Sequence, residues 1–262
     1  MLCSGSVKIA TWNVNSVRTR LPRLLPWLER RQPDVVCLQE TKVQDEHFPL
    51  AELEALGYQA LVSGERTYNG VAILSRSPGA KVIRALPGDG PDAPRRLLVT
   101  SSGGARIVNV YAPNGGELGS PGYTYKLGWY RRLLAFLESE VDAGEDVVVC
   151  GDFNIAPEDR DVWDPEQWRG HVMASEPERS SFRALLAWGL ADALRIHRPQ
   201  EGGLYTWWDY RAGAFHRNRG LRIDHILLSP SLAKRCAAVE IDRNERKGAR
   251  PSDHAPVVAT FE

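Results

Sequence analysis

Runs of apolar, mostly β-branched residues that stop at a polar side chain recur along the chain. "VKIATWN" ends at Asn13, "PDVVCLQE" at Glu40, "ARIVNVY" at Tyr111 and "DVVVCGD" at Asp152. Short continuous apolar runs bounded by turn residues are typical of buried strands. We therefore predict four buried strands, each of which presents a polar group at its downstream end.

Amphipathic helices are predicted between the members of two strand pairs. Apolar residues follow the first and third strands at the spacing of one helical face, at Leu21, Leu24, Leu25 and Leu28 and again at Leu127, Tyr130, Leu134, Leu137 and Val141. Each helix leads into the next buried strand. The two halves of the chain therefore share one plan, which predicts a structural repeat at low sequence identity.

Four more apolar segments complete the predicted strands, in "YNGVAILSR", "RRLLVTS", "GLRIDHILLS" and "APVVATFE". Many strands, few helices and connectors rich in Gly and Pro favour two sheets packed face to face, with helices outside. No linker rich in Pro, Gly or Ser divides the chain, so residues 1–262 are interpreted as a single domain.

Composition narrows the class of protein. Apolar residues make up 43% and charged residues 25%, and the formal net charge is zero. A neutral chain does not favour binding to nucleic acid through a general cationic field, although a local patch stays open. The first residues show no secretory signal, no run is long enough to span a bilayer, and the four cysteines are scattered. We expect reduced thiols in a cytoplasmic protein.

The polar residues at or just after strand ends form the candidate site: Asn13, Glu40, Tyr111, Asp152, Asn154, Asp224, Asp253 and His254. Each alone has a structural explanation, such as a turn cap or, for Asp224, an ion pair with Arg222 on the same strand face. Together they favour one site, because strand ends that face a common rim bring their side chains together.

The chemistry of this set favours a hard cation. Clustered carboxylates with little histidine and no cysteine suit Mg²⁺, with Mn²⁺ as a substitute, and not zinc. Glu40 is the first choice as metal ligand, and Asp253 helps directly or through water. We expect Asp224 to fix the tautomer of His254 and Asp152 to hold or deprotonate an attacking water.

The same motifs resemble the exonuclease III family of apurinic/apyrimidinic DNA repair endonucleases, within the endonuclease/exonuclease/phosphatase superfamily. The resemblance is carried by "TWNVNS", "LQETK", "YNGVAILSR", "VNVYAPN", "CGDFNIAP", "TWWDYR", "NRGLRIDHILLS" and "SDHAPV". It implies a four-layered α/β sandwich and Mg²⁺-dependent cleavage 5′ of an abasic site. It also implies 3′→5′ exonuclease activity, or 3′-phosphatase or phosphodiesterase activity. The implied partner is duplex DNA with abasic sites or blocked 3′ ends, and the implied state is a monomer.

The resemblance also assigns roles to individual residues. The metal side comprises Glu40, Asn13, Asp253, Asp152 and Asn154, and the catalytic set comprises Tyr111, Asp152, Asn154, Asp224 and His254. Trp207 is expected at the abasic pocket and Lys126 near the substrate backbone. Further substrate contacts are expected from Asn69, Arg95, Asn114 and Arg222. The loop "APNGGELGSPGYTY" departs from the family pattern.

Two other functions remain open at this point. The same metal site could act on a phospholipid or an inositol phosphate, although "TWWDYR" and the lack of a membrane-docking segment favour DNA. The chain could also be a catalytically silent module that binds abasic DNA. In that case the carboxylate and His254 set would have no chemical role.

Overall fold

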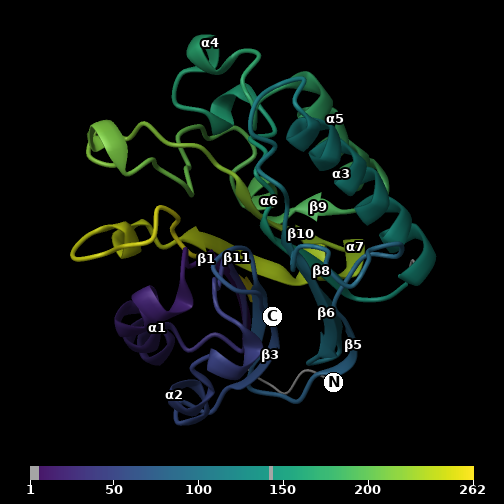
Figure 1. Ribbon diagram of the computed structural model, residues 1–262, viewed down its shortest axis with the longest axis vertical. Coiled ribbons are helices and arrows are strands. Elements are labelled where there is room, and N and C mark those ends of the chain that lie inside the picture. The colour runs from purple at the N-terminus through teal and green to yellow at the C-terminus, as the bar shows by residue number, and fades with distance from the viewer. Residues whose placement is uncertain (1–5, 142–143) are drawn as a thin grey trace.

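The structure, a computed structural model, describes residues 6–141 and 144–262, so Cys3 lies outside the described residues (Figure 1). Strands of this part of the chain form two six-stranded sheets. The first sheet has the order β11-β12-β1-β2-β4-β3, with bounds Cys236–Ile241, Val257–Phe261, Val7–Asn13, Val35–Gln39, Val71–Ser75 and Gln59–Ser63. The second has the order β5-β6-β7-β8-β10-β9, with bounds Ala80–Ile83, Leu97–Ser102, Ala105–Tyr111, Val147–Asp152, Asp224–Leu228 and Ala191–Asp192.

Both sheets are mixed, and each is built around one parallel pair. β1 pairs with β2 through α1 (Val17–Arg31), and β7 pairs with β8 through α3 (Pro121–Glu140). Each pair is extended on one side by a hairpin-like strand pair, β4-β3 or β10-β9. The predicted repeat is therefore confirmed: the two sheets have the same strand order about their parallel pairs.

Helices cover the outer face of each sheet (Figure 1). α1 and α2 (Leu50–Glu54) pack with the first sheet in one apolar cluster, and α3 and α5 (Glu176–Ala187) pack with the second sheet in another. A third cluster, with Cys37, Cys150 and Ile226, lies between the sheets. The remaining helices are short: α4 (Pro165–Trp168), α6 (Ala193–His197) and α7 (Pro230–Arg235). The four-layered α/β sandwich is confirmed.

Two helical features were not predicted. α3 begins at Pro121, inside the segment expected to be a loop, because the Ser120 side chain caps the Tyr123 amide and proline is favourable at the first helical position. α5 begins with a capping box between Ser175 and Glu178. The described helices include none that is long and apolar enough to cross a membrane.

Buried amides join the two sheets just behind the strand ends. Asn109 on β7 donates to the backbone carbonyls of Leu38 (3.0 Å) and Ala72 (2.9 Å) in the other sheet. Gln39 donates in turn to Asn109 (2.7 Å) and to Thr11 (2.9 Å). Since buried polar groups need partners, these bonds fix how the two sheets lie against each other next to the candidate site.

Candidate active site

The candidate site lies on the edge where β1, β2, β7 and β8 end and β10 begins. Tyr111 is the register partner of Asp152 on parallel strands, and Asp152 is the partner of Asp224 on antiparallel strands. Three neighbouring strands of one sheet therefore bring these side chains together. Asn13 is paired with Gln39 in the other sheet, and Glu40 follows directly.

One glycine makes the close packing of the second sheet possible. Gly151 is paired with Val110, and a Cβ at position 151 would lie 1.9 Å from the Val110 carbonyl oxygen. No side chain fits at that distance, so a glycine must precede Asp152.

Asn13 joins the two sheets at the rim. Its side-chain Nδ2 donates to Glu40 Oε1 and to Asp152 Oδ2, each at 2.9 Å. Glu40, Asp152 and His254 each offer one ligand atom, and these atoms lie within 4.8 Å of one another. The set could therefore hold a metal ion, and two of its three members are oxygen donors.

His254 is held by Asp224. The ring Nδ1 lies 2.9 Å from Asp224 Oδ2 and 3.1 Å from Oδ1, so Nδ1–H donates to that carboxylate and Nε2 is left facing Asp152 Oδ2 at 3.8 Å. Burial disfavours the imidazolium, but the charges of Asp224 and then Asp152 outweigh it and raise the pKa of His254 to about 10. The imidazolium is therefore the stable form near neutral pH.

Asp152 is shielded from solvent and has a perturbed acidity. Burial is the main reason why its pKa rises to about 7; the charges of Asp224 and Glu40 raise the pKa further, whereas His254 and Asn13 oppose the rise. Its Oδ1 accepts a hydrogen bond from the backbone N–H of Asn154 at 2.9 Å. A pKa near neutral is what a general base requires.

Tyr111 lies at the same rim and is stacked by a guanidinium. Burial, with the nearby charges of Glu40 and Asp152, raises the pKa of Tyr111 well above its ordinary value. The Arg96 guanidinium carbon lies 4.7 Å from the ring centroid, and Arg96 donates to the Tyr111 carbonyl at 3.3 Å. The phenol is therefore a hydrogen-bond donor and not a base near neutral pH.

Lys126 has a different place from the one expected. Its Nζ is buried and contacts Glu178 Oε1 (2.5 Å), the Asn154 carbonyl (2.6 Å) and the Asn114 carbonyl (3.0 Å). Neither side chain of the Lys126–Glu178 pair is exposed to solvent. The substrate contact expected of Lys126 stays a prediction: in the structure its ammonium is buried behind Asn154 and supports the backbone there.

Arg222 is also buried and does not face the rim. Its guanidinium donates to Asp161 (2.6 and 3.1 Å) and to Asp192 (2.7 Å). The alternative ion pair with Asp224 is therefore wrong, and the substrate contact stays a prediction for a side chain that is already paired with two acids. The reason is local: β10 begins at Asp224, so the alternation of a strand does not extend back to Arg222.

Asp253 is occupied by two donors. Asn15 donates to its Oδ1 at 2.8 Å, and the Trp207 indole donates to its Oδ2 at 3.0 Å. Asp253 is not part of the metal-capable group, so the structure places it as the anchor of Trp207. Trp207 is half-buried beside the rim, whereas Trp208 is fully buried against Phe215, as the opposite facing of adjacent residues predicts.

The other expected substrate contacts, Asn114, Asn69 and Arg95, have partners within the chain. Asn114 is exposed, and its Nδ2 lies 3.5 Å from Asn154 Oδ1. The Asn69 side chain contacts Glu65. The Arg95 guanidinium turns back to the Pro91 carbonyl at 3.1 Å, so Arg96 and not Arg95 stands at Tyr111. Both arginines precede β6, so strand alternation does not separate them and the sequence alone does not show which one reaches Tyr111.

Sequence reasoning missed Asn15 and Lys42. Lys42 Nζ lies 2.8 Å from Glu40 Oε2 and 2.6 Å from Asn15 Oδ1, and Asn15 holds Asp253. Both residues belong to the quoted motifs "TWNVNS" and "LQETK", two positions after Asn13 and Glu40. This equal spacing from two predicted site residues could have indicated that Asn15 and Lys42 also belong to the site.

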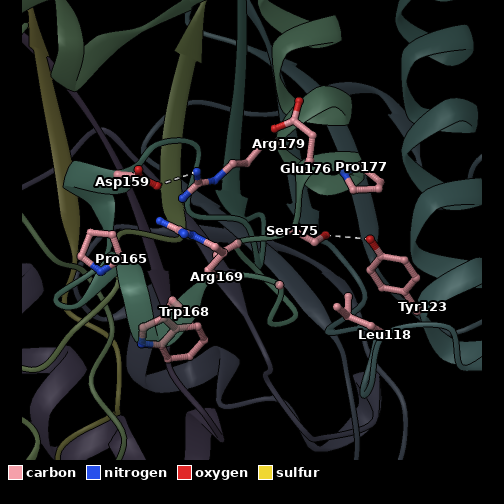
Figure 2. A pocket seen from close by; sticks show the side chains of 12 residues that line it. Leu118, Tyr123, Asp159, Pro165, Trp168, Arg169, Ser175, Glu176, Pro177 and Arg179 are labelled. Atoms are coloured by element: carbon pink, nitrogen blue, oxygen red, sulfur yellow. Dashed lines mark hydrogen bonds and ion pairs between the residues drawn. The ribbon is translucent and has the colours of Figure 1, made fainter.

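A separate pocket of about 500 Å³ lies beside α4 and the start of α5 and includes none of the rim residues (Figure 2). Figure 2 shows Trp168 and Arg169 near its centre, and it shows Ser175 bonded to Tyr123 and Asp159 bonded to Arg179. None of the residues of the metal-capable group lines this pocket.

A double-sheet sandwich with acids, amides and an imidazole at one rim defines a phosphoesterase of the DNase I-like class. A sequence profile of the Endonuclease/Exonuclease/phosphatase family matches residues 10–254, and the chain belongs to that family.

Its relatives agree with this assignment. The chain is 36% identical to "Exodeoxyribonuclease III" of Haemophilus influenzae, over 97% of this chain and all of the relative. It superposes on a 3′ phosphatase, NExo from Neisseria bound to product DNA hairpin, with a TM-score of 0.95, 44% identity and coverage of 98% and 99% of the two chains. It superposes on an AP endonuclease from Archaeoglobus fulgidus with a TM-score of 0.94, 41% identity and the same coverage. The resemblance to the exonuclease III family is confirmed.

Proposed function

We propose that this protein is a Mg²⁺-dependent DNA repair nuclease that hydrolyses the phosphodiester 5′ of abasic sites and removes 3′ nucleotides or blocking groups. The observation that carries the proposal is the Asn13 bridge, which holds the Glu40 and Asp152 carboxylates side by side next to the Asp224–His254 dyad. The names of the similar proteins, an exodeoxyribonuclease III, a 3′ phosphatase and an AP endonuclease, support this substrate class.

Glu40 and Asp152 are the residues that would hold the metal ion. Both offer oxygen, which suits Mg²⁺ or Mn²⁺, whereas His254 is charged and bonded to Asp224 and is therefore a poor ligand. When bound, the ion polarises a phosphoryl oxygen and offsets the negative charge of the displacement. The donor set of the rim fits this role.

The remaining steps fall to the side chains. Asp152 accepts the proton of the attacking water, for which a pKa of about 7 is suitable. The His254 imidazolium donates from Nε2 to a phosphoryl oxygen, and Asp224 keeps that tautomer in place. Tyr111 donates a hydrogen bond from its protonated hydroxyl to the phosphate. As the water oxygen bonds to phosphorus, the bond from phosphorus to the 3′-oxygen breaks, and that oxygen takes up a proton from solvent. Asn154, supported by Lys126 from behind, orients the water beside Asp152.

DNA recognition is assigned to loops around this rim. Trp207, held by Asp253, offers an aromatic face to an abasic sugar or an unstacked nucleotide. Arg96, which stacks on Tyr111, and the exposed Asn114 are suited to phosphate oxygens. We further propose a monomeric, cytoplasmic enzyme, in keeping with the free, buried cysteines Cys37, Cys150 and Cys236 of the described residues.

The test uses three duplexes: one with a single abasic analogue, one with a 3′-phosphate and one undamaged. With Mg²⁺ we expect a nick 5′ of the abasic analogue and release of phosphate from the second duplex, and both should stop with a chelator. Asp152→Asn and His254→Asn should each lower turnover by about 10²-fold or more, whereas Lys81→Ala on the edge strand β5 should not.

The outcomes separate the parts of the proposal. Cleavage of only the 3′-phosphate substrate would limit the activity to end cleaning. Failure to act on any of the three duplexes, with hydrolysis of an inositol phosphate instead, would reject the DNA substrate. Tight binding of the abasic duplex without cleavage would make the chain a binding module.

A further inference from the structure

The Lys42 side chain places a positive charge next to Glu40, the carboxylate that we propose as a metal ligand. Its ammonium lies 2.8 Å from Glu40 Oε2, and the two side chains are only 28% and 18% exposed. The other oxygen of Glu40 accepts from Asn13. Each oxygen of this carboxylate therefore already has one partner from the chain, and one of the two partners is a cation.

The backbone is bent to bring this about. Glu40 and Lys42 both have positive φ, at 50° and 53°, a conformation that is unfavourable for residues with a side chain. The bend is held by hydrogen bonds from the Ser16 amide to the Glu40 carbonyl (2.7 Å) and from the Lys42 amide to the Asn69 carbonyl (3.0 Å). Residues with a strained backbone conformation cluster at functional sites.

Lys42 is also the middle of a chain of contacts. Its ammonium lies 2.6 Å from Asn15 Oδ1, and Asn15 Nδ2 donates to Asp253 at 2.8 Å. Asp253 accepts from Trp207. One lysine thus connects the metal-side carboxylate to the support of the aromatic residue at the proposed DNA pocket.

The charges around Lys42 determine how it affects a metal ion at Glu40. Glu40, Asp152, Asp224 and Asp253 are acids within this network, and the partly buried site screens them weakly. A divalent ion at Glu40 is repelled by an ammonium bonded to the same carboxylate, by an amount that is large at such separations.

We propose that Lys42 is a fixed counter-ion that shares Glu40 with the divalent metal, keeping the carboxylate in place and lowering its affinity for the ion. The inference rests on the proposed metal site at Glu40. Weakened affinity lets the ion be supplied together with the substrate phosphate, whose charge offsets the repulsion from Lys42.

The experiment measures Mn²⁺ binding by the full chain without DNA, by calorimetry and by the loss of the free-ion signal in electron paramagnetic resonance. Lys42→Met should bind Mn²⁺ about tenfold more tightly than the unaltered protein, because a unit positive charge is removed beside Glu40. Lys42→Arg, which keeps the charge, should stay within about twofold. Lys81→Met on β5 is the matched control outside the site and should have no effect.

Lys42→Gln, a polar and uncharged variant, provides the same comparison if Lys42→Met does not fold. Unchanged or weaker Mn²⁺ binding in a folded neutral variant overturns the role of Lys42. A raised KM for DNA with unchanged Mn²⁺ affinity would show a phosphate contact instead and would also overturn it. Failure of the unaltered protein to bind Mn²⁺ at all would reject the proposed metal site itself.

Discussion

Asn13 and Asp152, 139 positions apart in the chain, are joined by a 2.9 Å hydrogen bond that crosses from one sheet to the other. The same amide group reaches Glu40 at 2.9 Å. A single uncharged side chain therefore sets the spacing between two carboxylates that would otherwise repel each other. In the mechanism that we propose, metal binding and water activation both depend on that spacing.

Asn13→Ala should lower kcat by about 10²-fold and move the acid limb of the pH–rate profile to higher pH. The reason is that the Asn13 hydrogen bond lowers the pKa of Asp152 against the effect of burial, so its loss raises that pKa further. The measurements are kcat and kcat/KM on an abasic duplex from pH 5 to 10. Asn244→Ala, at an exposed position, is the control, and an unshifted acid limb in Asn13→Ala would contradict the assignment.

The unaltered enzyme should show a bell-shaped profile. Activity should rise as Asp152, with a pKa of about 7, loses its proton and fall as His254, with a pKa of about 10, loses its own. Rising Mg²⁺ should move the acid limb to lower pH, because a bound cation favours the carboxylate. His254→Asn should remove the alkaline limb. An alkaline limb that persists in this variant would mean that another group, such as Tyr111, sets it.

Lys126→Met should destabilise the fold by about 3 kcal/mol, because it leaves the buried Glu178 carboxylate without its cation. Chemical denaturation measures this change. Arg169→Met, which breaks an exposed pair with Glu166, should cost less than about 1 kcal/mol. Where folded Lys126→Met is recovered, KM for DNA should be near normal; normal stability with a raised KM would restore Lys126 as a phosphate contact.

Because His225 is buried, we expect the protein to lose stability in acid. Burial, with Arg222 adding, lowers its pKa from 6.5 to about 4, and its Nδ1 faces the Arg222 guanidinium at 3.0 Å. The folded protein keeps this ring neutral, whereas the unfolded chain takes up a proton below pH 6.5. The free energy of unfolding is therefore highest above pH 6.5 and falls as the pH drops from 6.5 to about 4.

The size of this effect is roughly 3 kcal/mol in the free energy of unfolding. Denaturation curves of the unaltered protein and His225→Gln should therefore converge or cross between pH 6.5 and pH 4.5. His216→Gln, an exposed histidine, should follow the unaltered protein throughout. Parallel curves for His225→Gln would show that His225 is not held neutral.

Much of the site could be predicted from sequence because it is built at strand ends. A β-branched apolar run identifies a buried strand, and the first polar residue after it marks the rim, as for Asn13, Glu40 and Asp152. Sheet topology then brings these ends together. The four-layered fold followed from the same strand pattern together with the family motifs.

The rest depended on tertiary partners that local patterns do not encode. Arg222 and Lys126 are long cations that sequence alone places equally well at a phosphate or at a buried acid. Here Asp161 and Glu178, from distant segments, decide the outcome. Lys42 was missed because a turn with two left-handed residues, not a strand or helix period, directs it at Glu40.

The pairing of β1 with β12 ties the first described strand to the last. Asn13 ends β1 and His254 stands just before β12, and Trp12 donates to the His254 carbonyl at 3.2 Å. During synthesis on the ribosome, Asn13, which bridges the two carboxylates, emerges long before its imidazole neighbour His254. A nascent chain thus carries no assembled nuclease centre until His254 has left the ribosome.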